Sequence, residues 1–126
     1  MKLWIDDVRP APEGYIWCKS VNEAKRVIVY SENAILNYSR YALWAWIDGR
    51  FDKHSEFMQK IREAQIELID IDHDAGDYYY DGGDYIKLLD CLEDADLSYP
   101  IHIHSMNPVG VANMRAIIQR NGWKEV

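Results

Sequence analysis

The sequence predicts an α/β fold with a mainly parallel central sheet. Apolar runs with the length of strands occupy residues 2–6, residues 66–72 and the stretch "IHIHS" that follows Pro100. A segment with helical periodicity lies downstream of each of these runs. Strands that alternate with helices in this way favour a parallel sheet with helices on both faces.

Three helices and a last short strand follow from local signals. The predicted helices span residues 21–30, residues 83–95 and the stretch from the turn at Asn107 to Gly122, and "WKEV" is the last strand. Ser20 is followed three residues later by Glu23, which is a capping box. Gly122 stands where a helix C-terminus prefers glycine.

The segment 31–64 interrupts this alternation. Asp48-Gly49 is a hairpin turn signal, and strand-forming residues flank it in "YALWAWIDGRFDKH". We therefore expect an extended or β-hairpin insertion, in which Trp44 and Trp46 belong to the core. A short helix should follow, capped by Ser55, with Phe57, Ile61 and Ala64 on one side.

Length and composition describe one globular domain. The chain has 126 residues, of which 48% are hydrophobic and 28% charged. No apolar run is long enough for a membrane span, and the first residues lack the apolar region of a signal peptide. Two cysteines provide no disulfide framework, so we expect a cytoplasmic protein. A net charge of −7 argues against binding to duplex nucleic acid.

Polar side chains follow three of the predicted strands at the point where each strand ends. Asp6-Asp7 follow the first strand, Asp72-His73-Asp74 follow the second, and His104-Ser105 end the third. Ligands of open parallel sheets bind outside the carboxyl ends of the strands. The sequence therefore predicts a functional site at this edge.

The stretches "WIDDVRPAP", "IDIDHDAG" and "PIHIHSMNPVG" closely resemble the motifs of the cyclic-phosphate processing receiver domains. This family is a divergent branch of the response-regulator receiver fold. The resemblance covers both ends and the centre of the chain and leaves residues 31–64 outside. It implies a receiver-like (flavodoxin-like) three-layer sandwich with an insertion around residues 31–64, and an activity on cyclic phosphates.

Ordinary receivers differ from this chain in instructive places. Asp6-Asp7 match their acidic pair, Asp72 or Asp74 matches the phosphoacceptor, and Ser105 matches the hydroxyl residue. The lysine expected after the fifth strand has no clear counterpart, because Lys124 stands two residues before the end. His73 and His104 have no equivalent in ordinary receivers. A phosphorylation switch is therefore the least favoured of the three functions we consider.

The predicted roles follow from phosphodiester chemistry. His73 and His104 can share general acid and base work, because imidazole titrates near neutral pH, and Asp72 or Asp74 can orient an imidazole or raise its pKa. Arg9, Ser105 and Asn107 are the predicted phosphate ligands. Asp6, Asp7 and Asp74 are predicted to bind Mg²⁺ or Mn²⁺, with Asp72 as a further candidate ligand. The sequence does not decide between a metal-assisted and a two-histidine mechanism.

Other residues have simpler interpretations. Alternation with apolar neighbours favours His102 as a packed strand residue, and His54 is expected at the surface. Asp70 is equally compatible with a buried structural carboxylate and a ligand. Tyr78, Tyr79 and Tyr80 form either a base-stacking lid or an ordinary surface loop.

The predicted function is hydrolysis of a small cyclic-phosphate compound, derived from a nucleotide or an RNA end, by a phosphodiesterase-like domain. The alternative is a non-catalytic receiver-like module that binds a nucleotide or a protein partner.

Overall fold

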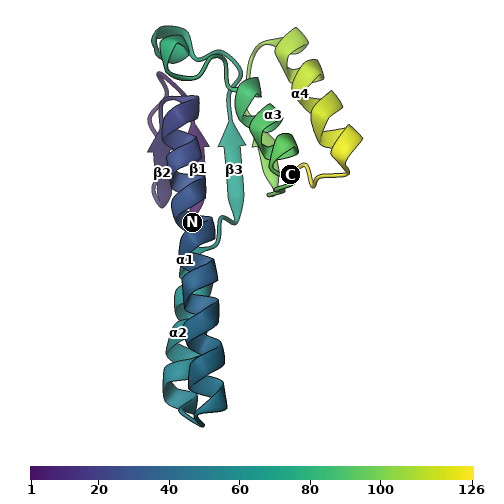
Figure 1. The fold of residues 1–126 in the computed structure, drawn as a ribbon. Coiled ribbons are helices and arrows are strands. Elements are labelled where there is room, and N and C mark those ends of the chain that lie inside the picture. Colours follow the sequence, from purple (N-terminus) through teal and green to yellow (C-terminus); the bar gives the residue numbers. More distant parts are fainter. The chain divides into compact units, whose positions relative to one another are not determined.

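The computed structural model describes all residues from Met1 to Val126, in two compact units. One unit comprises residues 1–26 and 66–126, and the other residues 27–65. The elements in chain order are β1 (Lys2–Ile5), β2 (Tyr15–Cys18), α1 (Val21–Ile47), α2 (Phe51–Ala64), β3 (Leu68–Ile71), the short 3₁₀ helix η1 (Gly76–Asp81), α3 (Ile86–Asp94), β4 (Ile101–Ile103) and α4 (Pro108–Asn121) (Figure 1).

The four strands form one parallel sheet in the order β2-β1-β3-β4. Side chains alternate between its two faces. One face contributes the core, where Leu3 lies beside Ile69 and Ile69 beside Ile101, all fully buried. The other face carries a row in which Trp4 lies beside Asp70 and Asp70 beside His102. The receiver-like α/β fold with a parallel sheet is confirmed.

Most of the predicted elements of the sheet unit are present. Ser20 Oγ accepts a hydrogen bond from the Glu23 N–H at 3.0 Å, as a capping box requires, while the Glu23 carboxylate accepts from the N–H of Lys19 at 2.9 Å. "WKEV" contributes only an isolated bridge between Glu125 and Ile101. The strand β2 was not predicted, because "YIWC" is short and follows a loop rich in proline and glycine.

Residues 27–65 form a helical hairpin, so the expected β-hairpin is wrong. Helix α1 continues to Ile47, and Gly49, with φ of +71°, turns the chain into α2. Small side chains allow close approach of the two helices within this unit: Ser31 Oγ donates to the Ala64 carbonyl at 2.6 Å, and His54 Nδ1 lies 2.9 Å from the Ala42 carbonyl.

Three local expectations in this segment fail with it. Trp44 and Trp46 are 65% and 58% exposed and are not core residues. Helix α2 begins at Phe51 rather than after Ser55. His54 is partly buried rather than a surface residue, because its ring contacts the Ala42 carbonyl.

Helix α4 begins and ends as predicted. Asn107 caps it by accepting the N–H of Gly110 at 3.0 Å, Pro108 is its first residue, and Gly122 follows it with φ of +65°. No helix of the chain combines the length and apolar character that a membrane span requires.

Candidate functional site

The carboxyl ends of β1, β3 and β4 bring the three polar motifs together. Ladder hydrogen bonds continue one residue past the strands: the Asp72 N–H donates to the Ile5 carbonyl at 2.9 Å, and the His104 N–H to the Ile71 carbonyl at 3.0 Å. These bonds fix Asp72 beside the end of β1 and His104 beside the end of β3. Side chains far apart in sequence therefore meet at one edge.

His104 is held on three sides. Its Nδ1 lies 2.7 Å from Asp70 Oδ1, and its Nε2 lies 2.9 Å from Asp6 Oδ2. Trp4 stacks on the ring with a centroid distance of 3.9 Å and an interplanar angle of 3°. An ionised carboxylate only accepts hydrogen bonds, so with both acids ionised both ring nitrogens carry protons. His104 thus lies between two carboxylates, with one ring nitrogen facing each.

Asp70 also binds the second histidine of β4. Its Oδ1 lies 2.9 Å from His102 Nδ1, and Asp70 itself is buried. His102 remains 45% exposed at its side chain, so it is not the packed strand residue that the alternation favoured. Asp70 acts as a buried structural carboxylate that orients both histidines.

Asp6 occupies a turn that stabilises its charge. Its Oδ1 accepts the backbone N–H groups of Val8 at 2.9 Å and Arg9 at 2.8 Å. Burial by itself would raise the pKa of this carboxyl, but these two bonds and the contact with His104 together lower it below its usual value. Asp6 is therefore held in its ionised form beside the His104 ring.

Asp7 lies in a contrasting environment. Burial and the nearby carboxylates of Asp6, Asp72 and Asp77 raise its pKa above the usual value. A Cβ at Gly76 would overlap the Asp7 carboxylate, and Gly76 also has φ of +54°, so only glycine suits this position. The start of η1 thus closes over Asp7.

The acids fit a cation only in part as predicted. Asp6, Asp72 and His104 each offer one ligand atom, and these atoms lie within 4.8 Å of one another. Two carboxylates with one imidazole suit Mn²⁺ or another transition ion better than Mg²⁺, which prefers oxygen ligands. Asp7 lies near this group, whereas Asp74 is not part of it.

Asp74 instead pairs with His73. Its Oδ1 lies 2.9 Å from His73 Nδ1, and the His73 side chain is only 14% exposed. Because the carboxylate accepts, we assign the proton to Nδ1. The polar contacts of this ring all involve Nδ1, and none involves Nε2. A Cβ at Gly110 would overlap the His73 ring, so glycine lets α4 approach it.

Two of the predicted phosphate ligands, Ser105 and Asn107, lie at the start of α4. Ser105 Oγ accepts the Asn107 N–H at 3.1 Å, and the Asn107 amide Nδ2 lies 3.5 Å from both His73 Nδ1 and Asp74 Oδ2. Arg9 is exposed and reaches the His104 carbonyl at 3.4 Å. A hollow of about 510 Å³ adjoins this region and is lined by Ser105, Met106, Pro108, Val111, Ala112 and Arg115.

The tyrosine loop forms η1. Asp81 at its end accepts hydrogen bonds from Ser20 Oγ at 2.6 Å and Asn22 Nδ2 at 3.1 Å, which fix η1 to the start of α1. Tyr79 and Tyr80 are exposed.

Sequence reasoning overlooked Trp4 and gave Asp70 no definite role. The available signal was alternation, since residues two apart in a strand share a face. Trp4 precedes Asp6, Asp70 precedes Asp72 and His102 precedes His104 by two residues each. A second row of site residues could therefore have been read from the pattern.

The family model for the cyclic-phosphate processing receiver domain matches residues 1–39 and 42–120. The chain belongs to this family. The match is wider than the three motifs, and it includes most of the helical hairpin that they leave outside. No curated protein and no solved structure matches the chain.

Proposed function

We propose that this cyclic-phosphate processing receiver domain hydrolyses a small cyclic phosphodiester, derived from a nucleotide or an RNA end, at the carboxyl edge of the sheet. The observation that carries the proposal is the His73–Asp74 pair, with Nε2 available beside the start of α4. An imidazole whose other nitrogen is fixed by a carboxylate is a competent general base.

The proposed reaction opens the phosphate ring with water. His73 Nε2 takes a proton from the water as its oxygen bonds to phosphorus, and the ring P–O bond breaks. His104 gives its Nε2 proton, which Asp6 now accepts, to the departing oxygen. Solvent then takes the added proton from His73 and supplies a new proton to His104. Asp70 and Trp4 keep the His104 ring in place throughout.

The acidic edge fits this substrate class by charge. A cyclic phosphodiester carries one negative charge, whereas the monoester product carries nearly two at neutral pH. Arg9 and the Asn107 amide supply positive charge and a donor for one phosphate. The carboxylates of Asp6, Asp7 and Asp72 repel the more highly charged product, which favours its release.

A metal-assisted version uses the same residues differently. Asp6, Asp72 and His104 would hold a Mn²⁺ or Mg²⁺ ion, which lowers the pKa of bound water. His104 Nε2 cannot both ligate an ion and protonate the leaving oxygen. The two versions are therefore separable by their response to a chelator.

The second candidate function is ligand binding without turnover. It is favoured by one observation: both ring nitrogens of His104 already lie within hydrogen-bond distance of a carboxylate, so its Nε2 proton is not freely available to a substrate. A domain of this kind would bind the same phosphate without breaking it.

Phosphorus NMR of the protein with a panel of cyclic phosphates tests the proposal. The panel contains 2′,3′- and 3′,5′-cyclic nucleotides, each with Mg²⁺, Mn²⁺ or chelator. We expect a cyclic signal to convert to a monoester signal with wild-type protein and not with His73→Ala or His104→Ala. Signals that broaden without converting support the binding module, and unchanged signals under every condition contradict both functions.

A further inference from the structure

Helix α1 exposes an apolar stripe in the unit of residues 27–65. Val29, Leu36, Leu43 and Ile47 are each between 53% and 59% exposed. They are spaced by seven, seven and four residues, so they lie on one side of the helix. We call these four residues the α1 stripe.

The α1 stripe faces away from α2. The contacts of α1 with α2 involve Ser31 and Ala42, which lie about 100–140° around the helix from Leu36 and Leu43, at about 100° per residue. Aromatic rings extend the apolar surface, because Tyr30 and Trp44 follow stripe residues directly and are also exposed.

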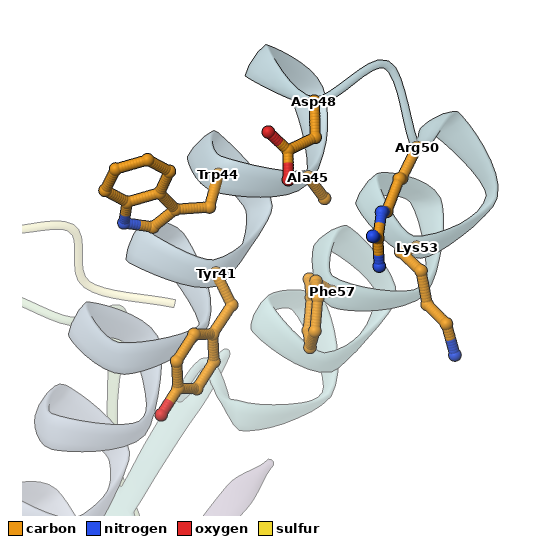
Figure 2. A pocket seen from close by; sticks show the side chains of 7 residues that line it. All are labelled: Tyr41, Trp44, Ala45, Asp48, Arg50, Lys53 and Phe57. Carbon is orange, nitrogen blue, oxygen red and sulfur yellow. The ribbon is translucent and has the colours of Figure 1, made fainter.

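Figure 2 shows how Trp44 differs from its neighbours near the hairpin turn. Its indole projects from α1 on the side away from α2, whereas the Tyr41 and Phe57 rings lie between the helices, 5.5 Å apart. The hollow there, about 410 Å³, is lined by Tyr41, Trp44, Ala45, Asp48, Arg50, Lys53 and Phe57.

The spacing of the stripe specifies what covers it. Exposed apolar residues along one side of a helix, here over about five turns from Val29 to Ile47, suit a second helix that packs lengthwise against them. A hairpin of two helices has one interface between them, and a second apolar face on the same helix is typical of a four-helix bundle made from two hairpins. The expected occupant is therefore a helix.

Charge favours a second copy of this chain as that occupant. Residues 27–65 carry five basic side chains (Arg40, Arg50, Lys53, Lys60 and Arg62) and five acidic ones (Glu32, Asp48, Asp52, Glu56 and Glu63). Their net charge is zero, so the formal charge of −7 resides entirely in the remaining residues. Two copies can meet along this segment without the repulsion that their other surfaces impose.

We propose that the α1 stripe is a self-association surface through which two copies pair in antiparallel orientation. A two-fold axis at Leu36 places Val29 of one copy opposite Leu43 of the other. The same register places Arg40 opposite Glu32, whereas a parallel pair would place Arg40 beside Arg40. The starts of the two α1 helices are then roughly 45 Å apart at a rise of about 1.5 Å per residue, well beyond the Debye length of about 8 Å.

Sedimentation velocity from about 1 µM to about 100 µM tests the surface. We expect wild-type protein to sediment as a dimer at the upper end and Leu36→Glu as a monomer, because the two-fold axis brings both new carboxylates together. Phe51→Glu is the matched control, since Phe51 is as exposed as the stripe residues but belongs to α2. It should dimerise like wild type, and circular dichroism should show equal helix content in all three.

Cysteine cross-linking tests the orientation, in a Cys91→Ser background that leaves only the buried Cys18. Leu36→Cys should form an intermolecular disulfide and Leu43→Cys should not, because the two copies of residue 43 are too far apart. Cross-linking at both positions would contradict the antiparallel register. A wild type that stays monomeric at every concentration, or a dimer that Leu36→Glu leaves intact, overturns the proposal.

Discussion

The sheet edge buries charged side chains, whereas the helical hairpin exposes large apolar side chains. At the edge, Asp6 and Asp70 are buried, and each is bound by several donors. In the hairpin, the buried polar contacts are few, such as that of Ser31 with the Ala64 carbonyl, while large apolar side chains face solvent.

Each arrangement has a cost that points to a use. Burying a carboxylate is unfavourable unless it is paired and hydrogen-bonded. Apolar stripes on a surface favour association. The edge therefore has the features of a chemical site, and the hairpin those of an interaction surface.

The largest effect on stability should come from Asp70, the buried carboxylate that contacts both His102 and His104. Asp70→Ala removes the partner of both His102 and His104 and should lower the free energy of unfolding by about 3–5 kcal/mol. Asp48→Ala in the hairpin should change it by less than about 0.5 kcal/mol, because Asp48 is exposed. Urea denaturation measures both, and equal losses would mean that the edge is no more constrained than the hairpin.

Substitutions at two glycines distinguish the stability cost of a packing clash from that of backbone strain. Gly110→Ala places a Cβ against the His73 ring and should cost about 1–3 kcal/mol despite the better helix propensity of alanine. Gly49→Ala meets no atom within 4 Å but adopts φ of +71°, which costs about 1–2 kcal/mol.

The stabilities of these variants will therefore be similar, and their His73 signals should differ. In proton–nitrogen NMR spectra, Gly110→Ala should shift the His73 imidazole resonances, whereas Gly49→Ala should leave them in place. An unmoved ring in Gly110→Ala would show that α4 does not position His73.

The smallest effect concerns the attachment of η1 to α1. Hydrogen bonds from Ser20 and Asn22 lower the pKa of Asp81. Because the pKa of Asp81 is lower in the folded protein than in the unfolded chain, these bonds stabilise the protein fully at pH values above the unfolded-state pKa of about 3.9. Their stabilisation is lost as the pH falls through the folded-state pKa of Asp81.

Asp81→Asn should therefore flatten the fall in stability below about pH 4. Asp52→Asn in the hairpin is the matched control and should retain the wild-type slope. Chemical denaturation at several pH values compares them, and identical slopes for Asp81→Asn and wild type would contradict the role of these bonds.

The sequence predicted the sheet better than the hairpin for a physical reason. Strands such as β3 are short apolar runs whose ends are marked by charged residues, and parallel topology then brings those ends together. The hairpin was misread because Tyr41, Trp44 and Trp46 have high β propensity and surround an Asp-Gly turn. Helical spacing of the buried residues decided otherwise, and it is visible only over the whole segment.

The sequence predicted where the site residues lie better than it predicted which of them are hydrogen-bonded to each other. Strand ends located the acids and histidines, and Asp74 was one of two carboxylates expected to orient an imidazole, as it does for His73. Nothing in the sequence indicates that Asp6 and Asp70 share His104. Such pairs depend on register across neighbouring strands and on the close approach of α4 at Gly110. Both are set by tertiary packing.

The most direct test compares one histidine from each region. His73 and His54 both have Nδ1 in a hydrogen bond, His73 with Asp74 and His54 with the Ala42 carbonyl. Phosphorus NMR should follow a cyclic nucleotide that wild-type protein hydrolyses, with His73→Ala and His54→Ala in parallel. The account predicts that His73→Ala loses about 10²–10⁴-fold in rate while His54→Ala retains the wild-type rate. Equal rates in the two variants would contradict a catalytic role for the sheet edge.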